Sequence, residues 1–279
     1  MPQLGDAQAL QPERQPCSIR VVVTRPEREA KVWADALQAR GIDCDILPLI
    51  QISALTDTSV LASVWAGVPK HLALMFVSAN AVRFFMDGRP PGQPMPTCRA
   101  WSTGPGTESA LLAAGWPAEL IDSPDANSPQ FDSEALWHQV AARVDAAVQQ
   151  GRSKPSVLIV RGADAHGQLA GRDWLAQQMA VAGLEVCQTV AYARQAPPLN
   201  RAQRQSIGQA LVDGAWWLFS SSEAAQHLLE SCPDLPWSQA RAFATHPRIA
   251  QRLQAAGWGC VQNVPASIDA QAKSIKSWA

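Results

Sequence analysis

Short apolar runs alternate with stretches of helical periodicity over most of this chain. The first two apolar runs and the helical stretch between them form a strand–helix–strand unit. Residues 19–24 are a β-branched apolar run with the length of a buried strand. Pro26 follows where a helix can begin, because the first turn does not use the amide proton that proline lacks. Residues 30–37 place apolar side chains at i, i+3, i+4 and i+7, which predicts one apolar helix face. Gly41 ends this helix, and residues 44–50 begin a second strand.

A second strand–helix–strand unit lies near the middle of the chain. Residues 157–160 predict a strand, and residues 161–162 predict the turn after it. A helix over residues 174–182 and a strand over residues 186–192 complete the unit. Arg25 and Arg161 therefore hold the same place, just past the end of a first strand.

A longer repeat is clearer. Residues 72–85 and 215–228 both contain an apolar strand, a serine-bearing turn and a helix, and residues 99–116 and 241–258 both add another strand, turn and helix. Self-similarity that occurs only twice predicts two copies of one α/β domain and not a solenoid. Alternating strands and helices predict parallel sheets that are covered on both faces, with sites beyond the carboxyl ends of the strands.

Two extended segments follow the strand–helix–strand units. Residues 46–54 and 186–198 carry β-branched residues and nearby prolines, as linkers between domains do. The order of the units leaves open which strand–helix–strand unit packs with which copy of the longer repeat.

Composition excludes several classes of protein. The chain is 47% hydrophobic and 17% charged, which indicates a globular protein and neither a disordered nor a membrane one. The formal net charge of −1 gives no bulk attraction to nucleic acid or anionic lipid. Residues 1–16 are polar and lack the features of a signal peptide, so we expect a flexible lead and a cytoplasmic protein.

Cysteine and histidine spacing predicts no metal site. The six cysteines contain no C-x-x-C pair, and the five histidines form no pair with ligand spacing. Buried, reduced thiols are the expected state of these cysteines.

The segment from Thr103 to Thr107 follows a predicted strand and precedes a predicted helix. Its two glycines, Gly104 and Gly106, supply part of a G-x-G-x-x-G pattern, whose third place is occupied by Ser109. The incomplete pattern argues against a dinucleotide site. Free amide groups at the helix start still favour an anion such as a carboxylate.

Serines occupy the matching turns of the longer repeat. Ser78 and the run Ser220, Ser221 and Ser222 can cap helices and can also present hydroxyl groups to a cleft. No G-x-S-x-G motif surrounds them, so a hydrolase nucleophile is not expected. Tyr192 is the single tyrosine, set against 11 tryptophans that we expect mostly in the core.

Six segments, taken in order, resemble the uroporphyrinogen-III synthase family, and the resemblance covers nearly the whole chain after residue 16. They are VTRPEREA, FVSANAVRFF, TGPGTESALLAAG, LIVRGADAHGQL with the VAYAR strand (residues 190–194) after it, LFSSSEAAQHL, and ATHPRIAQRLQAAGW.

The resemblance implies an α/β fold with two similar parallel-sheet domains joined by a pair of extended linker strands. The first domain would comprise residues 17–50 and 194–279, and the second residues 54–189. It also implies the conversion of hydroxymethylbilane to uroporphyrinogen III, with loss of water and inversion of ring D, in haem biosynthesis. The family uses no cofactor and no metal.

Site residues follow from the resemblance and from the turns together. Tyr192 is the candidate catalytic residue, because the family match places a tyrosine there, facing the cleft, to assist departure of the hydroxyl group. Where family members often carry G-x-T-T, this chain has residues 245–249, THPRI, so Arg248 or His246 are the candidate substitutes. The candidate substrate-binding residues are Arg25, Ser78, Thr103, Gly104, Gly106, Thr107, Arg161, Gly162, Ser220, Ser221, Ser222, Thr245 and Arg248.

The expected partner is the linear tetrapyrrole, with transient contact to the preceding pathway enzyme, and the expected state is a monomer. Two other functions stay open: a two-lobed binding protein for small anions without catalysis, and a nucleotide-dependent transferase that uses the loop at Gly104 and Gly106.

Overall fold

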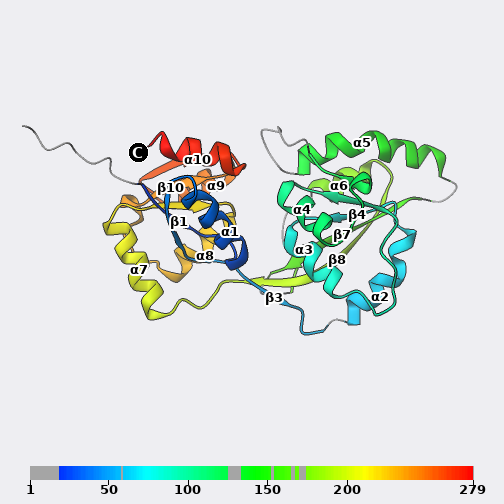
Figure 1. Ribbon diagram of the computed structural model, residues 1–279, viewed down its shortest axis with the longest axis horizontal. Coiled ribbons are helices and arrows are strands. Elements are labelled where there is room, and N and C mark those ends of the chain that lie inside the picture. Colours follow the sequence, from blue (N-terminus) through cyan, green and yellow to red (C-terminus); the bar gives the residue numbers. More distant parts are fainter. Residues whose placement is uncertain are drawn as a thin grey trace, which may run out of the picture.

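Two α/β lobes lie side by side in the computed structural model, joined by two extended strands (Figure 1). The structure describes residues 19–57, 59–124, 133–151, 154–164, 167–169 and 174–278, so the expected lead over residues 1–16 lies outside the described residues. Each lobe contains one parallel-dominated sheet with helices on both faces. The predicted fold class is confirmed.

The first lobe is built on a five-stranded parallel sheet in the order β11-β10-β9-β1-β2. Its strands are β1 (Arg20–Val23), β2 (Asp43–Ile46), β9 (Trp216–Phe219), β10 (Arg241–Ala244) and β11 (Cys260–Asn263). One face packs on α1 (Glu27–Gln38) and α10 (Ile268–Lys276). The other face packs on α7 (Arg201–Val212), α8 (Ser222–Ser231) and α9 (Pro247–Ala255).

The second lobe contains a six-stranded sheet in the order β3-β8-β7-β4-β5-β6. Its strands are β3 (Gln51–Ala54), β4 (Ala73–Phe76), β5 (Arg99–Ser102), β6 (Ile121–Asp122), β7 (Ser156–Ala163) and β8 (Glu185–Gln195). On one face lie α2 (Ser59–Gly67), α3 (Ala79–Asp87) and α4 (Pro105–Ala113), and on the other α5 (Ser133–Gln150) and α6 (Trp174–Val181). Three short 3₁₀ helices are η1 (Val68–Lys70), η2 (Ala118–Leu120) and η3 (Trp237–Gln239).

Burial on both faces explains why the strands read as unbroken apolar runs. In β1, Val21 and Val23 pack toward α1 and α10, while Val22 packs toward α7 and α8. Alternate side chains of a strand point to opposite faces, so a strand covered on both faces needs apolar residues at every position.

Strand pairing settles the question that the order of the units left open. β1 pairs with β9, so the first strand–helix–strand unit shares a sheet with the second copy of the longer repeat. β7 pairs with β4, so the second unit shares a sheet with the first copy. β3 runs antiparallel to the end of β8, with Ala54 opposite Tyr192 and Gln51 opposite Gln195. These two strands are the connection between the lobes.

Three expected boundaries were wrong. Arg161 and Gly162 do not form a turn, because β7 continues through Ala163 with an irregularity in its pairing with β8 between them. Tyr192 does not end a strand, because β3 pairs with β8 as far as Gln195. The strand expected over residues 44–50 ends at Ile46, and residues 47–50 lead into β3.

Candidate functional site

In the first lobe, the predicted site residues gather at one edge of the sheet. Arg25, Ser220 and Thr245 follow the neighbouring parallel strands β1, β9 and β10, so they stand at the same carboxyl edge. The Thr245 amide donates to the Phe219 carbonyl at 3.0 Å, which holds the two turns together. Ser221 caps α8, because its Oγ accepts a hydrogen bond of 3.2 Å from the Glu223 amide.

Arg25 lies against the first helix. Its guanidinium carbon is 3.9 Å from the centre of the Trp33 ring, a cation–π arrangement. Burial lowers the pKa of Arg25 to about 10, and the Glu29 carboxylate partly opposes that shift. The guanidinium therefore stays charged at neutral pH.

In the second lobe, the turns after β4 and β5 meet in the same way. Ser78 caps α3, and its Oγ accepts a hydrogen bond of 3.1 Å from the Ala81 amide. Thr103 Oγ1 donates to the Val77 carbonyl at 3.3 Å, which ties the second turn to the first. Gly104 and Thr107 are buried, whereas Gly106 is exposed at the start of α4 with open space around its Cα.

Tyr192 is buried where these turns meet. Its hydroxyl oxygen is 3.0 Å from Ser78 Oγ, and its ring stacks on Phe84 with centroids 5.7 Å apart. Only 1% of the residue is exposed, so the phenol does not reach solvent. A tyrosine that faces an open cleft would be more exposed, and the structure does not bear out that expectation. The ring also lies against Gly162, whose missing side chain leaves room for it, since a Cβ atom there would come within 2.7 Å of Tyr192 Cε2.

Arg161 and Arg248 differ in their surroundings. Arg161 is 3% exposed, and its Nη1 donates to Gln188 Oε1 at 2.9 Å, so it lies inside the second lobe. Arg248 is exposed in the first turn of α9, where its amide donates to His246 Nδ1 at 3.1 Å and His246 caps the helix.

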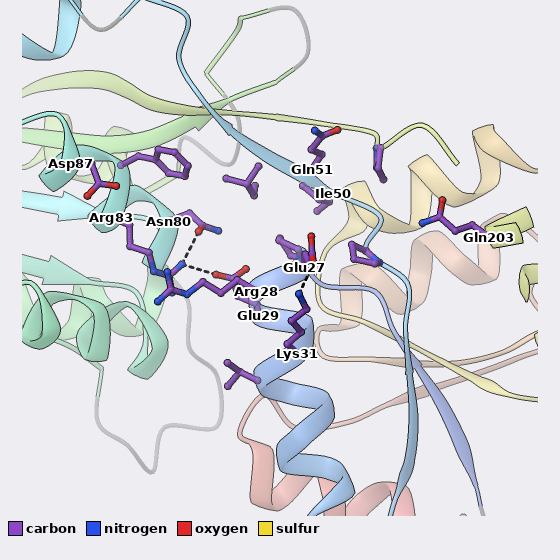
Figure 2. A pocket seen from close by; sticks show the side chains of 16 residues that line it. Glu27, Arg28, Glu29, Lys31, Ile50, Gln51, Asn80, Arg83, Asp87 and Gln203 are labelled. Atoms are coloured by element: carbon purple, nitrogen blue, oxygen red, sulfur yellow. Dashed lines mark hydrogen bonds and ion pairs between the residues drawn. The ribbon is translucent and has the colours of Figure 1, made fainter. Parts of the chain in front are cut away.

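A cavity of about 800 Å³ opens between the lobes, beside the starts of α1 and α3 (Figure 2). Its walls come from both lobes and from the linkers. It contains none of the predicted site residues, although it begins one residue after Arg25 and two residues after Ser78. The lining residues are Pro26, Glu27, Arg28, Glu29, Lys31, Val32, Pro48, Ile50, Gln51, Ile52, Asn80, Arg83, Phe84, Asp87, Pro197 and Gln203.

The walls carry balanced charge. The basic side chains are those of Arg28, Lys31 and Arg83, and the acidic ones those of Glu27, Glu29 and Asp87. Lys31 Nζ lies 2.6 Å from Glu27 Oε1, within α1. Arg83 Nη1 on α3 lies 2.9 Å from Glu29 Oε1 on α1, so this ion pair joins the two lobes (Figure 2).

The predicted site residues do not include four residues of the cavity wall, although the sequence carries a signal for them: Asn80, Arg83, Phe84 and Asp87. They stand at i, i+3, i+4 and i+7 of α3, on one helix face, and all four line the cavity. Reading the face of each helix that follows a predicted turn, and not the turn alone, would have found them.

A second set of contacts fixes the first lobe to the linkers. Arg194 on β8 forms an ion pair with Glu223 on α8. His227 Nδ1, also on α8, lies 2.7 Å from the Leu49 carbonyl just before β3. Both linker segments are therefore held by the same helix.

Neither a metal site nor a membrane span is found in the described part of the chain. In it, no three His, Cys, Asp or Glu side chains gather as metal ligands would. No helix within the described ranges is both long and apolar enough to cross a membrane.

Comparison with known proteins connects this geometry to one family. The family model described as uroporphyrinogen-III synthase HemD matches residues 31–271. A solved uroporphyrinogen-III synthetase of Helicobacter pylori is similar with a TM-score of 0.57 and 14% identity, over 94% of this chain and 100% of that chain. A mutant uroporphyrinogen III synthase of Thermus thermophilus has a TM-score of 0.54 and 14% identity, over 93% of this chain and 98% of that one. At 14% identity these two solved structures support the fold alone. The match of the family model over residues 31–271 supports the assignment of the chain to this family.

Proposed function

Because the chain belongs to the uroporphyrinogen-III synthase family, we propose that it converts hydroxymethylbilane to uroporphyrinogen III in the cavity between its lobes. The reaction makes the enzyme a carbon–oxygen hydro-lyase. The observation that carries the proposal is the cavity itself, whose walls come from both lobes and combine apolar side chains with three basic and three acidic ones. Such a site suits a flexible ligand with an apolar framework and carboxylate arms.

The proposed reaction needs positioning more than it needs a strong catalyst. The C–O bond of the hydroxymethyl group breaks, and the oxygen takes up a proton and leaves as water. Ring D attacks the resulting azafulvene through its substituted α-carbon, which gives a spiro intermediate. The bond from that carbon to the methylene of ring C then breaks and a new bond forms at the free α-carbon of ring D, which loses its proton, so that ring D is inverted. A flexible tetrapyrrole must be held folded while this happens. Amide and hydroxyl groups at the turns of Ser78, Thr103 to Thr107, Ser220 to Ser222 and Thr245 do not line the cavity itself. They are the proposed anchors for carboxylate arms that extend beyond it.

We assign Tyr192 the role of hydrogen-bond donor to the departing hydroxyl group. Its support is the contact with Ser78 at the start of α3, two residues before Asn80 of the cavity wall. Phe84 stacks on the tyrosine and also lines the cavity, so the phenol reaches substrate only when the Phe84 ring moves aside.

The domain bounds, the location in the cell, the oligomeric state and the contact with another enzyme are also proposals. Residues 17–50 and 194–279 form one domain and residues 54–189 the other. The five strands of the first sheet lie in the first domain and β4 to β7 in the second, while β3 and β8 cross the proposed boundaries. The enzyme acts as a cytoplasmic monomer without metal or cofactor. It meets the preceding pathway enzyme transiently, because hydroxymethylbilane is unstable.

One experiment tests the reaction directly. Fresh hydroxymethylbilane is added to the purified protein, the product is oxidised, and the uroporphyrin isomers are separated by chromatography. We expect isomer III, at a rate that EDTA does not change. Closure without ring inversion gives isomer I, so isomer I alone, at the rate of the protein-free blank, would contradict the proposal. Binding of the tetrapyrrole without turnover would instead support the anion-binding alternative.

A further inference from the structure

The ion pair between Arg83 and Glu29 stands in the wall of the proposed substrate cavity. Arg83 Nη1 lies 2.9 Å from Glu29 Oε1 and donates to Asn80 Oδ1 at 2.8 Å (Figure 2). The two charged side chains are 29% and 21% exposed, so solvent and small solutes can reach them. Both contacts use one nitrogen of a guanidinium that carries five N–H donors.

The balance of charges in the cavity makes the Arg83–Glu29 pair the place where a substrate carboxylate can find a positive partner. Three basic and three acidic side chains balance, so the cavity has no surplus positive charge for a polycarboxylate. Glu27, Glu29 and Asp87 would repel carboxylate arms. A substrate carboxylate gains a strong contact where it can replace a protein carboxylate on an arginine, because the guanidinium keeps a charged partner throughout the exchange.

We propose that Arg83 binds a carboxylate of the linear tetrapyrrole, and that Glu29 is the internal competitor that holds Arg83 when the cavity is empty. Arg83 is then a specificity-determining residue for polycarboxylate substrates, and Glu29 sets the strength of binding. The identity of the substrate rests on the proposed function. The placement of Arg83 and Glu29 rests on the structure alone.

Steady-state kinetics with fresh hydroxymethylbilane tests the exchange. Arg83→Gln removes a charge-assisted hydrogen bond to substrate, so KM rises about tenfold while kcat changes less than about twofold. Glu29→Gln frees Arg83 from its competitor, so KM falls by about threefold or more. In the double variant Arg83 is absent, so the gain from Glu29→Gln shrinks to the general effect of removing one negative charge. KM then falls below that of Arg83→Gln by no more than Glu27→Gln lowers it in the wild-type background.

Glu27→Gln is the matched control. It removes the same charge from the same turn of α1 and the same cavity wall, but Glu27 is paired with Lys31 and not with Arg83. We expect it to lower KM less than Glu29→Gln does. An equal fall in both variants would mean that bulk electrostatics, not exchange at Arg83, governs binding, and would overturn the inference. A double variant in which Glu29→Gln lowers KM as strongly as it does beside an intact Arg83 would overturn it as well.

Melting temperatures are measured for every variant, because the ion pair joins the lobes. If Arg83→Gln does not fold, Arg83→Lys is used in its place. Lysine keeps the positive charge but lacks the planar fork of the guanidinium, so we expect KM to rise while kcat stays unchanged. Wild-type protein that forms isomer III, together with an unchanged KM in the Arg83 variant, overturns this inference alone. Wild-type protein that forms no isomer III overturns the proposed function and this inference with it.

Discussion

The hydroxyl oxygens of Ser78 and Tyr192 lie 3.0 Å apart, and Ser78 Oγ also accepts the Ala81 amide proton at 3.1 Å. One serine therefore caps α3 and contacts the only tyrosine of the chain. Removing the Ser78 hydroxyl group therefore removes both the cap and the contact with the phenol, because both use the same oxygen.

Tyr192→Phe keeps the packing of the ring and removes only the hydroxyl group. If the phenol assists departure of the substrate hydroxyl, turnover falls by about 10²-fold or more, the range of general-acid help. Stability changes by about 1 kcal/mol at most, since a single neutral hydrogen bond is lost. Single-turnover kinetics and thermal unfolding measure the two effects separately. A folded Tyr192→Phe protein with wild-type turnover would remove the hydroxyl group from the mechanism.

Single changes at the other turns should have small effects. Ser78→Ala, Thr107→Ala and Ser221→Ala each remove one hydroxyl group, and we expect turnover to fall by about tenfold or less, because a neutral hydrogen bond contributes roughly 1 kcal/mol. Ser221→Ala also removes the cap of α8 and should cost about 1 kcal/mol of stability. Ser206→Ala, an exposed position within α7, is the control for the same chemical change. Complete loss of activity in one folded variant would point to a nucleophile mechanism.

Acid should weaken the second lobe through His71. Burial lowers the pKa of His71 below its ordinary value of 6.5, and the Glu185 carboxylate partly opposes this shift. The unfolded chain therefore takes up the proton first as pH falls. The contribution of His71 to stability is full above about pH 6.5 and is lost below it, toward the folded pKa.

His71→Gln removes this titration and keeps a polar side chain near Ser156 Oγ, which lies 2.9 Å from His71 Nδ1. Thermal unfolding between about pH 7.5 and about pH 5 measures the contribution of His71 to acid sensitivity. The loss in melting temperature on acidification should be larger for the wild type than for the variant. Equal losses would show that other groups carry the acid sensitivity.

Local patterns were enough to predict the elements and the fold class. The apolar run before Pro26 became β1, and the i, i+3, i+4, i+7 positions of residues 30–37 became the buried face of α1. These features depend on neighbours a few positions away, which periodicity reports directly. The pairing of the units came from the family resemblance and not from the periodicity.

The face of α3 that lines the cavity follows a helical period, but the pairing of that face with α1 could not be predicted in this way. Glu29 and Arg83 are 54 positions apart, and they meet only because the linkers place α1 opposite α3. The burial of Tyr192 likewise depends on Phe84, which stacks on its ring, and on the absence of a side chain at Gly162, which leaves room for the ring. Long-range contacts of this kind leave no periodic trace in the sequence.

Gly162→Ala tests how closely the second lobe fixes the tyrosine. A Cβ atom at Gly162 would lie 2.7 Å from Tyr192 Cε2 and 2.8 Å from Cζ, closer than side-chain carbons approach. The ring must therefore move, and the buried strand around it must adjust, at a cost of about 1–3 kcal/mol. The displaced phenol also loses its geometry with Ser78, so turnover should fall in the protein that remains folded.

Gly208→Ala is the matched control, because a Cβ there, within α7, meets nothing within 4 Å. It should stabilise the protein by up to about 1 kcal/mol, since alanine is the better helix former, and leave turnover unchanged. Chemical denaturation and single-turnover kinetics compare the two variants. If Gly162→Ala kept both wild-type stability and wild-type turnover, the space beside Gly162 would not be what fixes Tyr192. The position of the phenol would then depend on Phe84 and Ser78 alone.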